Sequence, residues 1–216
     1  MIVAPLDHHW HARLRGLYLV TPDWEDTERL LAVTADAISG GAAVVQYRNK
    51  TADRSTRQTQ AQALKGLCER TGIPFVINDH VDLCLELEAD GVHLGHENMS
   101  LAAARAILGP ARMIGVSCYG SIERAVQAQA NGATYVALGG FFPSAVKAYP
   151  VTTSIETLRL TAARVHIPIA TIGGMSSANA PPLAAAGASM IAAISDIYCA
   201  ADPAAAAGAL ARLLDR

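Results

Sequence analysis

The chain has 216 residues, of which 51% are hydrophobic and 17% charged, so it can bury a sizeable core in one large domain or two small ones. Its net charge of -2 gives no general attraction to nucleic acid or to an acidic membrane, and we expect neither partner. No apolar stretch approaches the roughly 18 residues of a membrane span, and no secretory signal is evident. The 4 cysteines are far apart in sequence, which predicts free thiols and a cytoplasmic protein.

Strand-like and helix-like segments alternate from residue 16 onward. The predicted strands are residues 16–20, 43–46, 73–79, 91–95, 113–117, 135–139, 167–172 and 189–194. Helical periodicity or capping predicts helices around 30–38 and over 51–70, 81–88, 100–107, 122–130, 154–164, 179–186 and 204–214.

This alternation predicts an α/β protein with a single (β/α)8 TIM barrel over residues 16–216 and a short N-terminal extension over residues 1–15. An open doubly wound sheet usually has a glycine-rich turn after its first strand, but Thr21-Pro22-Asp23-Trp24 contains no glycine. The extension contains His8, His9 and His11, for which an arm or short leading helix is favoured over a metal site.

The end of the second predicted strand has a polar residue at every second position, namely Gln46, Arg48 and Lys50. Side chains alternate between the two faces of a strand, so these three share one face. The preceding run is apolar on both faces, as in an interior strand. Two cations at the end of a buried strand indicate a phosphate or pyrophosphate site, with a rim of salt bridges as the alternative.

Other strand ends are also polar or rich in glycine, and in a barrel all of them meet at one rim. Gly173-Gly174 and Ile194-Ser195 predict a phosphate cradle, for which tight turns are the alternative. Asp79, which follows Asn78, is a candidate ligand for Mg²⁺ or else a helix cap. His93 lies within an apolar strand, where a hydrogen-bonded core histidine is the commoner case.

Several ordered motifs together make the chain resemble the thiamine-phosphate synthase family. They are Gln46-Tyr47-Arg48-Asn49-Lys50, Val76-Ile77-Asn78-Asp79, residues 89–95, Gly115-Val116-Ser117-Cys118, Phe142-Pro143-Ser144, Ile172-Gly173-Gly174 and Ala193-Ile194-Ser195. The resemblance implies transfer of a pyrimidine-methyl group from its diphosphate to a thiazole phosphate, with Mg²⁺ as cofactor and these two small molecules as partners. It leaves the oligomeric state open, a homo-oligomer included.

The resemblance also implies a role for each matching residue. Its catalytic residues would be Arg48, Lys50, Ser117 and Lys147, and its metal ligands Asp79 and Asn98. Its substrate-binding residues would be Gln46, Tyr47, Asn49, Asn78, Ser144, Ala145, Val146, Gly174, Ile194 and Ser195.

Two positions depart from the family pattern. Asn98 stands where the family usually has a second aspartate, so it brings no negative charge to the metal, and Glu97 could replace that charge only if the loop shifts. Val146 stands where a hydroxyl residue is usual. A weakened sibling that binds thiazole phosphate or thiamine phosphate is therefore an alternative. A second alternative is a thiazole tautomerase, but those relatives often have a histidine after the serine, where this chain has Cys118-Tyr119.

Overall fold

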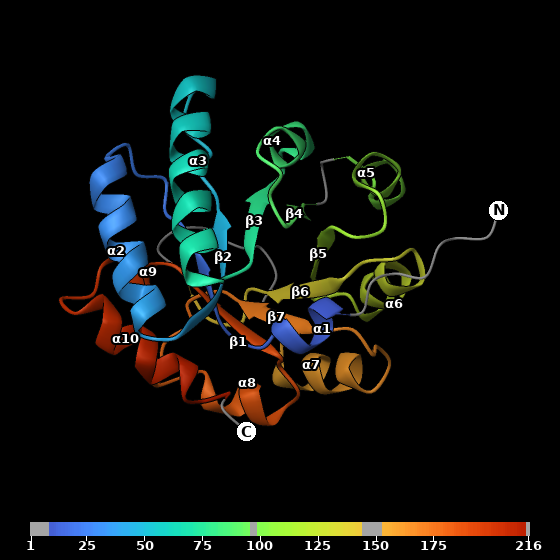
Figure 1. Cartoon of the computed structure of the whole chain (residues 1–216). Helices are drawn as coiled ribbons and strands as arrows, with labels where there is room; N and C mark the ends of the chain where they lie inside the picture. Colours follow the sequence, from blue (N-terminus) through green and yellow to red (C-terminus); the bar gives the residue numbers. More distant parts are fainter. Residues whose placement is uncertain (1–8, 96–98, 144–152, 215–216) are drawn as a thin grey trace.

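The computed structural model describes residues 9–95, 99–143 and 153–214. Its parallel strands close into a barrel in the order β1-β2-β3-β4-β5-β6-β7-β8, which confirms the predicted fold (Figure 1). The strands are β1 (Gly16–Val20), β2 (Ala42–Tyr47), β3 (Phe75–Asn78), β4 (Gly91–Leu94), β5 (Met113–Tyr119), β6 (Tyr135–Gly139), β7 (Ile169–Ile172) and β8 (Met190–Ala193). Because the strands are parallel, their carboxyl ends form one rim.

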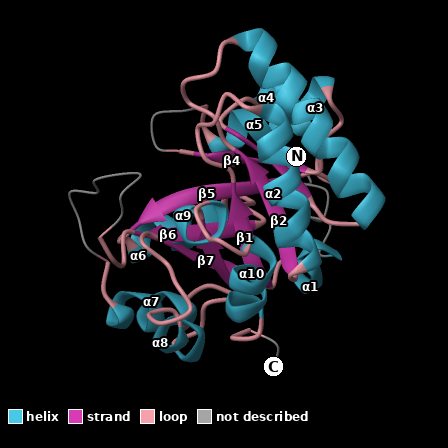
Figure 2. Cartoon of the chain, turned by 90° about the vertical axis from the view of Figure 1, so that its left-hand side faces the viewer, coloured by secondary structure: helices cyan, strands magenta, loops and turns pink. Residues whose placement is uncertain are grey.

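The helices lie around the outside of the strands (Figure 2). They are α1 (His9–Arg13), α2 (Thr27–Ser39), α3 (Arg54–Thr71), α4 (Val81–Glu86), α5 (Leu101–Leu108), α6 (Ile122–Ala130), α7 (Ile155–Ala162), α8 (Pro181–Ala185), α9 (Ser195–Tyr198) and α10 (Pro203–Ala211). Side chains of aspartate or serine cap the amino ends of several of them, as Ser100 does for α5 and Asp53 for α3. Sequence patterns did not predict α9, which is a single turn directly after β8.

Apolar side chains cover both faces of the strands. Outward-facing residues such as Leu19 and Val45 pack against the helices, whereas inward-facing residues such as Val44 and Met190 fill the barrel. This division follows from the alternation of side chains along each strand. In the described part of the chain, no helix is both long and apolar enough to cross a membrane.

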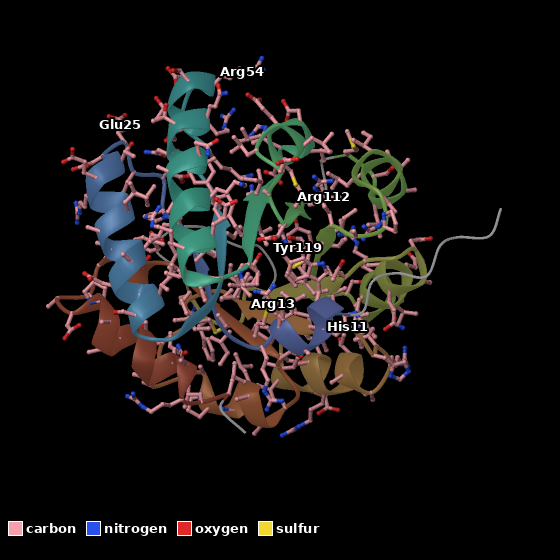
Figure 3. The ribbon with its side chains drawn as sticks, in the orientation of Figure 1. His11, Arg13, Glu25, Arg54, Arg112 and Tyr119 are labelled. Carbon is pink, nitrogen blue, oxygen red and sulfur yellow. The ribbon has the colours of Figure 1, made fainter. Side chains whose placement is uncertain are left out.

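Helix α1 closes the floor of the barrel. Trp10 and Leu14 are buried in the same cluster as the inward-facing strand residues. The Trp10 indole donates to the Ala111 carbonyl at 2.8 Å, and Arg13 donates to the Gly72 carbonyl at 2.7 Å, close to where β5 and β3 begin. In Figure 3, Arg13 and His11 lie on α1, low in the view, whereas Glu25 and Arg54 lie high, on the side to which the β2 and β3 arrows point in Figure 1. The ends of β2 and β3 therefore lie on the side of the barrel away from α1, where the predicted site residues are.

Candidate active site

A chain of polar contacts joins the ends of β2 and β3 at the upper rim. The Gln46 amide donates to Asn78 Oδ1 at 2.7 Å, and Asn78 Nδ2 donates to Asp79 Oδ2 at 2.7 Å. Lys50 Nζ lies 3.3 Å from the same carboxylate oxygen. The structure thus brings together four of the predicted site residues, and each fixes the orientation of the next.

Arg48 is held by an aspartate that sequence analysis did not assign to the site. Its guanidinium Nη1 donates to both carboxylate oxygens of Asp23, at 3.0 and 2.9 Å. Asp23 Oδ1 also accepts from the backbone N–H of Lys50 at 2.7 Å. Because β1 pairs directly with β2, the turn after β1 faces the cations after β2, and this adjacency was the sign that could have revealed Asp23. The rim of salt bridges that sequence analysis gave as the alternative to an anion site is therefore present in the structure.

Asp79 has a constrained backbone conformation at the end of β3. Its φ is 65°, a left-handed conformation that is uncommon for a residue other than glycine. Its backbone N–H donates to the His93 carbonyl at 2.9 Å, which fixes it between β3 and β4. Helix α4 has His80, not Asp79, at its N-cap position, and that cap makes no side-chain hydrogen bond. Asp79 therefore does not act as the helix cap considered as its alternative role.

The carboxylate of Asp79 suits a Mg²⁺ ion that is held mainly by the phosphate oxygens of a bound substrate. Asn78 and Lys50 both contact Oδ2 of the carboxylate, which leaves Oδ1 free of partners among the described residues and available to a cation. Mg²⁺ in phosphate sites commonly takes one or two carboxylates together with phosphate oxygens and water. Within the three described ranges, no group of three or more histidine, cysteine, aspartate or glutamate side chains could form a metal cage. Asn98, the other predicted ligand, and Glu97 lie outside the described residues.

The structure does not place Tyr47 and Asn49 with the other predicted substrate-binding side chains. Tyr47 is buried, and its hydroxyl donates to Gln60 Oε1 on α3 at 3.0 Å. Asn49 Nδ2 donates to the same oxygen at 3.1 Å and to the Trp24 carbonyl at 3.0 Å. Strand alternation explains this. Odd-numbered residues here face the helices, whereas Gln46 and Arg48 are on the face that points into the barrel. Both side chains therefore connect the end of β2 to helix α3.

Ser117 lies above a buried chain of hydrogen bonds inside the barrel. Its Oγ is 2.9 Å from His93 Nε2, His93 Nδ1 is 3.0 Å from the Tyr135 hydroxyl, and that hydroxyl is 2.6 Å from the Tyr18 hydroxyl. Burial lowers the pKa of His93 to about 4, so its ring is neutral near pH 7. The same burial raises the pKa of both tyrosines. His93 is thus the hydrogen-bonded core histidine expected from sequence, but it also contacts a site residue.

The loop after β7 depends on glycine, and β8 leads directly into helix α9. Gly174 has φ 59°, and a Cβ on it would lie 2.2 Å from the Pro143 carbonyl oxygen. Its own carbonyl accepts from Asn179 Nδ2 at 2.8 Å. Ile194 is the N-cap residue of α9, and Ser195 is the first residue of that helix. The backbone of Gly173-Gly174 is therefore held tightly against the segment that follows β6.

Five further predicted positions cannot be placed in the site. Four of them are binding or catalytic residues of the loop after β6, and one is a metal ligand. Ser144, Ala145, Val146, Lys147 and Asn98 all lie outside the described residues.

Comparison with known proteins places the chain in a family. A model of the family described as "Thiamine monophosphate synthase" matches residues 17–197. A thiamine-phosphate synthase from Janthinobacterium sp. (strain Marseille) is 52% identical over 202 residues, 94% of this chain and 98% of that protein. One from Aromatoleum aromaticum is 46% identical over 203 residues, again 94% and 98% of the two chains.

A solved structure agrees with these sequence relatives. The thiamine phosphate pyrophosphorylase from Pyrococcus furiosus superposes with a TM-score of 0.84 at 32% identity, covering 95% of this chain and 97% of that one. A 3-hexulose-6-phosphate synthase, 20% identical with a TM-score of 0.67, covers 92% of this chain and 99% of its own and shares the fold alone. The chain belongs to the thiamine monophosphate synthase family.

Proposed function

We propose that the protein joins 4-amino-2-methyl-5-(diphosphooxymethyl)pyrimidine to 4-methyl-5-(2-phosphooxyethyl)thiazole, giving thiamine phosphate and pyrophosphate. The C–O bond to the diphosphate breaks first, and its electron pair leaves with pyrophosphate. The thiazole nitrogen then donates its lone pair to the pyrimidine carbocation and forms the new C–N bond. The observation that supports this most directly is the contact of Lys50 with Asp79 beyond the ends of β2 and β3, with Arg48 nearby, in a barrel of this family.

The residues at the ends of β2 and β3 would hold the diphosphate. Arg48 and Lys50 supply positive charge toward the leaving group, and Asn78 supplies an amide. Gln46 and Ser117 would hold the aminopyrimidine. No side-chain nucleophile is needed, because catalysis rests on charge stabilisation and on positioning. Lys147 would add a further cation from the loop after β6.

Bound Mg²⁺ would neutralise the charge that develops on the diphosphate. Asp79 would hold it through Oδ1, and Asn98 would contribute a carbonyl oxygen without negative charge. This assignment predicts that Asn98→Asp lowers the Mg²⁺ concentration needed for half-maximal activity. An unchanged requirement in that variant would argue that Glu97 or water already fills the position.

The glycine-rich side would bind the second substrate. Gly174, Ile194 and Ser195 would cradle the thiazole phosphate through backbone N–H groups and the serine hydroxyl. Residues 144–146 would close over the thiazole. In the ring of eight strands β7 is opposite β3, so the two phosphorylated groups would approach the mouth from different sides.

The compartment we propose is the cytoplasm. Cys68, Cys84, Cys118 and Cys199 are free thiols, which supports a reducing environment. For three of them, burial raises the thiol pKa to about 12, so they are poor candidates for thiolate chemistry.

The decisive experiment is an assay with both substrates and Mg²⁺, in which thiamine phosphate and pyrophosphate are measured together by mass spectrometry. Equal formation of the two products supports the transferase. Tight binding of the thiazole phosphate without product would instead support the weakened sibling. Isomerisation of a thiazole phosphate tautomer in the absence of the pyrimidine substrate would support the tautomerase-like enzyme. The synthase relatives, 52% and 46% identical, favour the first outcome.

A further inference from the structure

Four strands contribute one side chain each to the hydrogen-bond chain beneath Ser117. The chain begins at Tyr18 on β1, deep in the barrel, and passes through Tyr135 on β6 and His93 on β4 to Ser117 on β5. Tyr18 is 2% exposed, Tyr135 0% and His93 7%. It therefore connects the buried interior of the barrel with the ends of the strands.

The barrel is built to hold these rings in place. The Tyr18 and Tyr135 rings meet edge to face with centroids 5.8 Å apart, and Tyr135 stacks on His93 at 5.6 Å. Gly115 leaves the space for Tyr135, since a Cβ at position 115 would lie 2.0 Å from the Tyr135 ring. At its upper end, β5 changes register between Ser117 and Tyr119, a bulge that sets the direction of the Ser117 side chain.

The positions of the protons follow from counting donors. Each tyrosine hydroxyl has one proton, and a neutral imidazole has one N–H and one acceptor nitrogen. Tyr18 is the inner end of the chain, and among the described residues its hydroxyl has one hydrogen-bond partner, Tyr135. A buried hydroxyl proton without an acceptor is costly, so Tyr18 donates to Tyr135.

The direction of every other bond is then fixed. Tyr135, which accepts from Tyr18, donates its own proton to His93 Nδ1. The His93 proton must therefore be on Nε2, from which it is donated to Ser117 Oγ. Ser117 keeps its own proton, which is directed away from His93. In the opposite arrangement, Ser117 would donate to His93, and the Tyr18 proton would be left in an apolar core without a partner.

We propose that Tyr135 and His93 are positioning residues that fix Ser117 as a hydrogen-bond donor toward the substrate in the mouth of the barrel, with Tyr18 as the inner donor to Tyr135. Because Ser117 is assigned to the aminopyrimidine, the substrate part of this inference rests on the proposed function. The group it recognises would be an acceptor, such as an unprotonated ring nitrogen or a diphosphate oxygen, and not the exocyclic amine. The tautomer of His93 is independent of any substrate.

The direct test is a long-range ¹H–¹⁵N NMR spectrum of the histidine rings in the whole protein at neutral pH, with His93→Gln used to assign the signal. We expect the Nε2–H tautomer in the unmodified protein. Tyr18→Phe should leave it unchanged, because Tyr135 still donates to Nδ1. Tyr135→Phe should shift the Nδ1 resonance, because Nδ1 loses its donor, while the proton stays on Nε2. A matched control is Tyr198→Phe, which removes a buried hydroxyl bonded to Thr34 in the helix layer and should leave the His93 signal unmoved. An Nδ1–H tautomer in the unmodified protein, or a switch of tautomer in Tyr18→Phe, would overturn the proposal.

Kinetics separate positioning from a general structural effect. Tyr135→Phe should raise KM for the pyrimidine diphosphate by about tenfold, as expected for one hydrogen bond, and leave KM for the thiazole phosphate within about twofold. Equal increases for both substrates, or no increase, would contradict the role in substrate binding. If the protein forms no thiamine phosphate, the proposed function fails. The NMR result still decides whether each hydroxyl and the imidazole donate in the direction from Tyr18 to Ser117.

Discussion

The two sides of the barrel mouth are held in place by different kinds of interaction. At the ends of β2 and β3, charged side chains are held by other charged side chains, as in the pairs Arg48–Asp23 and Lys50–Asp79. At the end of β7, the backbone itself comes close to the segment after β6, and glycine is required for that approach. The first side has two cations, but each is paired with a carboxylate, so an anion would compete with Asp23 and Asp79 for them and salt should weaken its binding. The second side contributes no cation from residues 173–179 or 194–198, so it differs from the first in offering backbone and hydroxyl groups.

The largest effect should come from removing a cation on the charged side. Lys50→Ala should lower kcat by about 10²–10³-fold, because a preorganised group that stabilises transition-state charge contributes about this much. Stability should change little, since the Lys50 side chain is 53% exposed. Steady-state kinetics with both substrates is the measurement, and the control is Arg159→Ala, a 64% exposed cation on α7. A loss below tenfold would show that Lys50 does not face the leaving group.

A smaller but structural effect is expected on the glycine side. Gly174→Ala adds a Cβ at 2.2 Å from the Pro143 carbonyl oxygen and places alanine at φ 59°. Left-handed strain alone should lower the free energy of unfolding by about 1–3 kcal/mol, and the clash should add to it. Gly72→Ala is the matched control, since its φ is 69° but no atom lies within 4 Å of the new Cβ. Urea unfolding of both variants separates clash from strain, and equal losses would mean that position 174 has room.

Asp23→Asn changes the charged side without removing a cation. The amide can still accept from the Lys50 N–H, so we expect a loss of about 1 kcal/mol in unfolding free energy. Arg48 loses a competing carboxylate, so pyrophosphate should bind at least as tightly as to the unmodified protein. Asp26→Asn makes the same change in the same loop, at the N-cap of α2, where asparagine caps equally well. Weaker pyrophosphate binding in Asp23→Asn would mean that Asp23 acts mainly by positioning Arg48.

The smallest effect should come from the outer face of β2. Tyr47→Phe removes the hydroxyl bonded to Gln60, and Asn49 still donates to the same oxygen. We expect a loss of about 0.5–1.5 kcal/mol in stability, measured by thermal unfolding, with KM for both substrates unchanged. A raised KM would show that Tyr47 contributes to substrate binding, as predicted from sequence.

Local rules account for what could be predicted from sequence. Apolar periodicity and glycine stops located the strands, and alternation along β2 placed Gln46 and Arg48 on one face. The same alternation argued against Tyr47 and Asn49 as members of that face. They had entered the site through a motif resemblance that does not distinguish the two faces of a strand.

Contacts between strands could not be predicted in the same way. The pairing of Arg48 with Asp23 joins residues 25 apart and requires the register between β1 and β2. The bond between Tyr18 and Tyr135 joins residues 117 apart and depends on barrel closure and on Gly115. Neither distance is encoded in a local pattern. The fold had to be known before these partners could be found.

The most direct test of the two-sided mouth is isothermal titration of Lys50→Ala and Ser195→Ala with each ligand separately. We predict that Lys50→Ala loses affinity for pyrophosphate with Mg²⁺ and keeps its affinity for the thiazole phosphate, whereas Ser195→Ala shows the reverse. Equal losses of both ligands in both folded variants would contradict the account, because they would mean that one shared anion site serves both substrates.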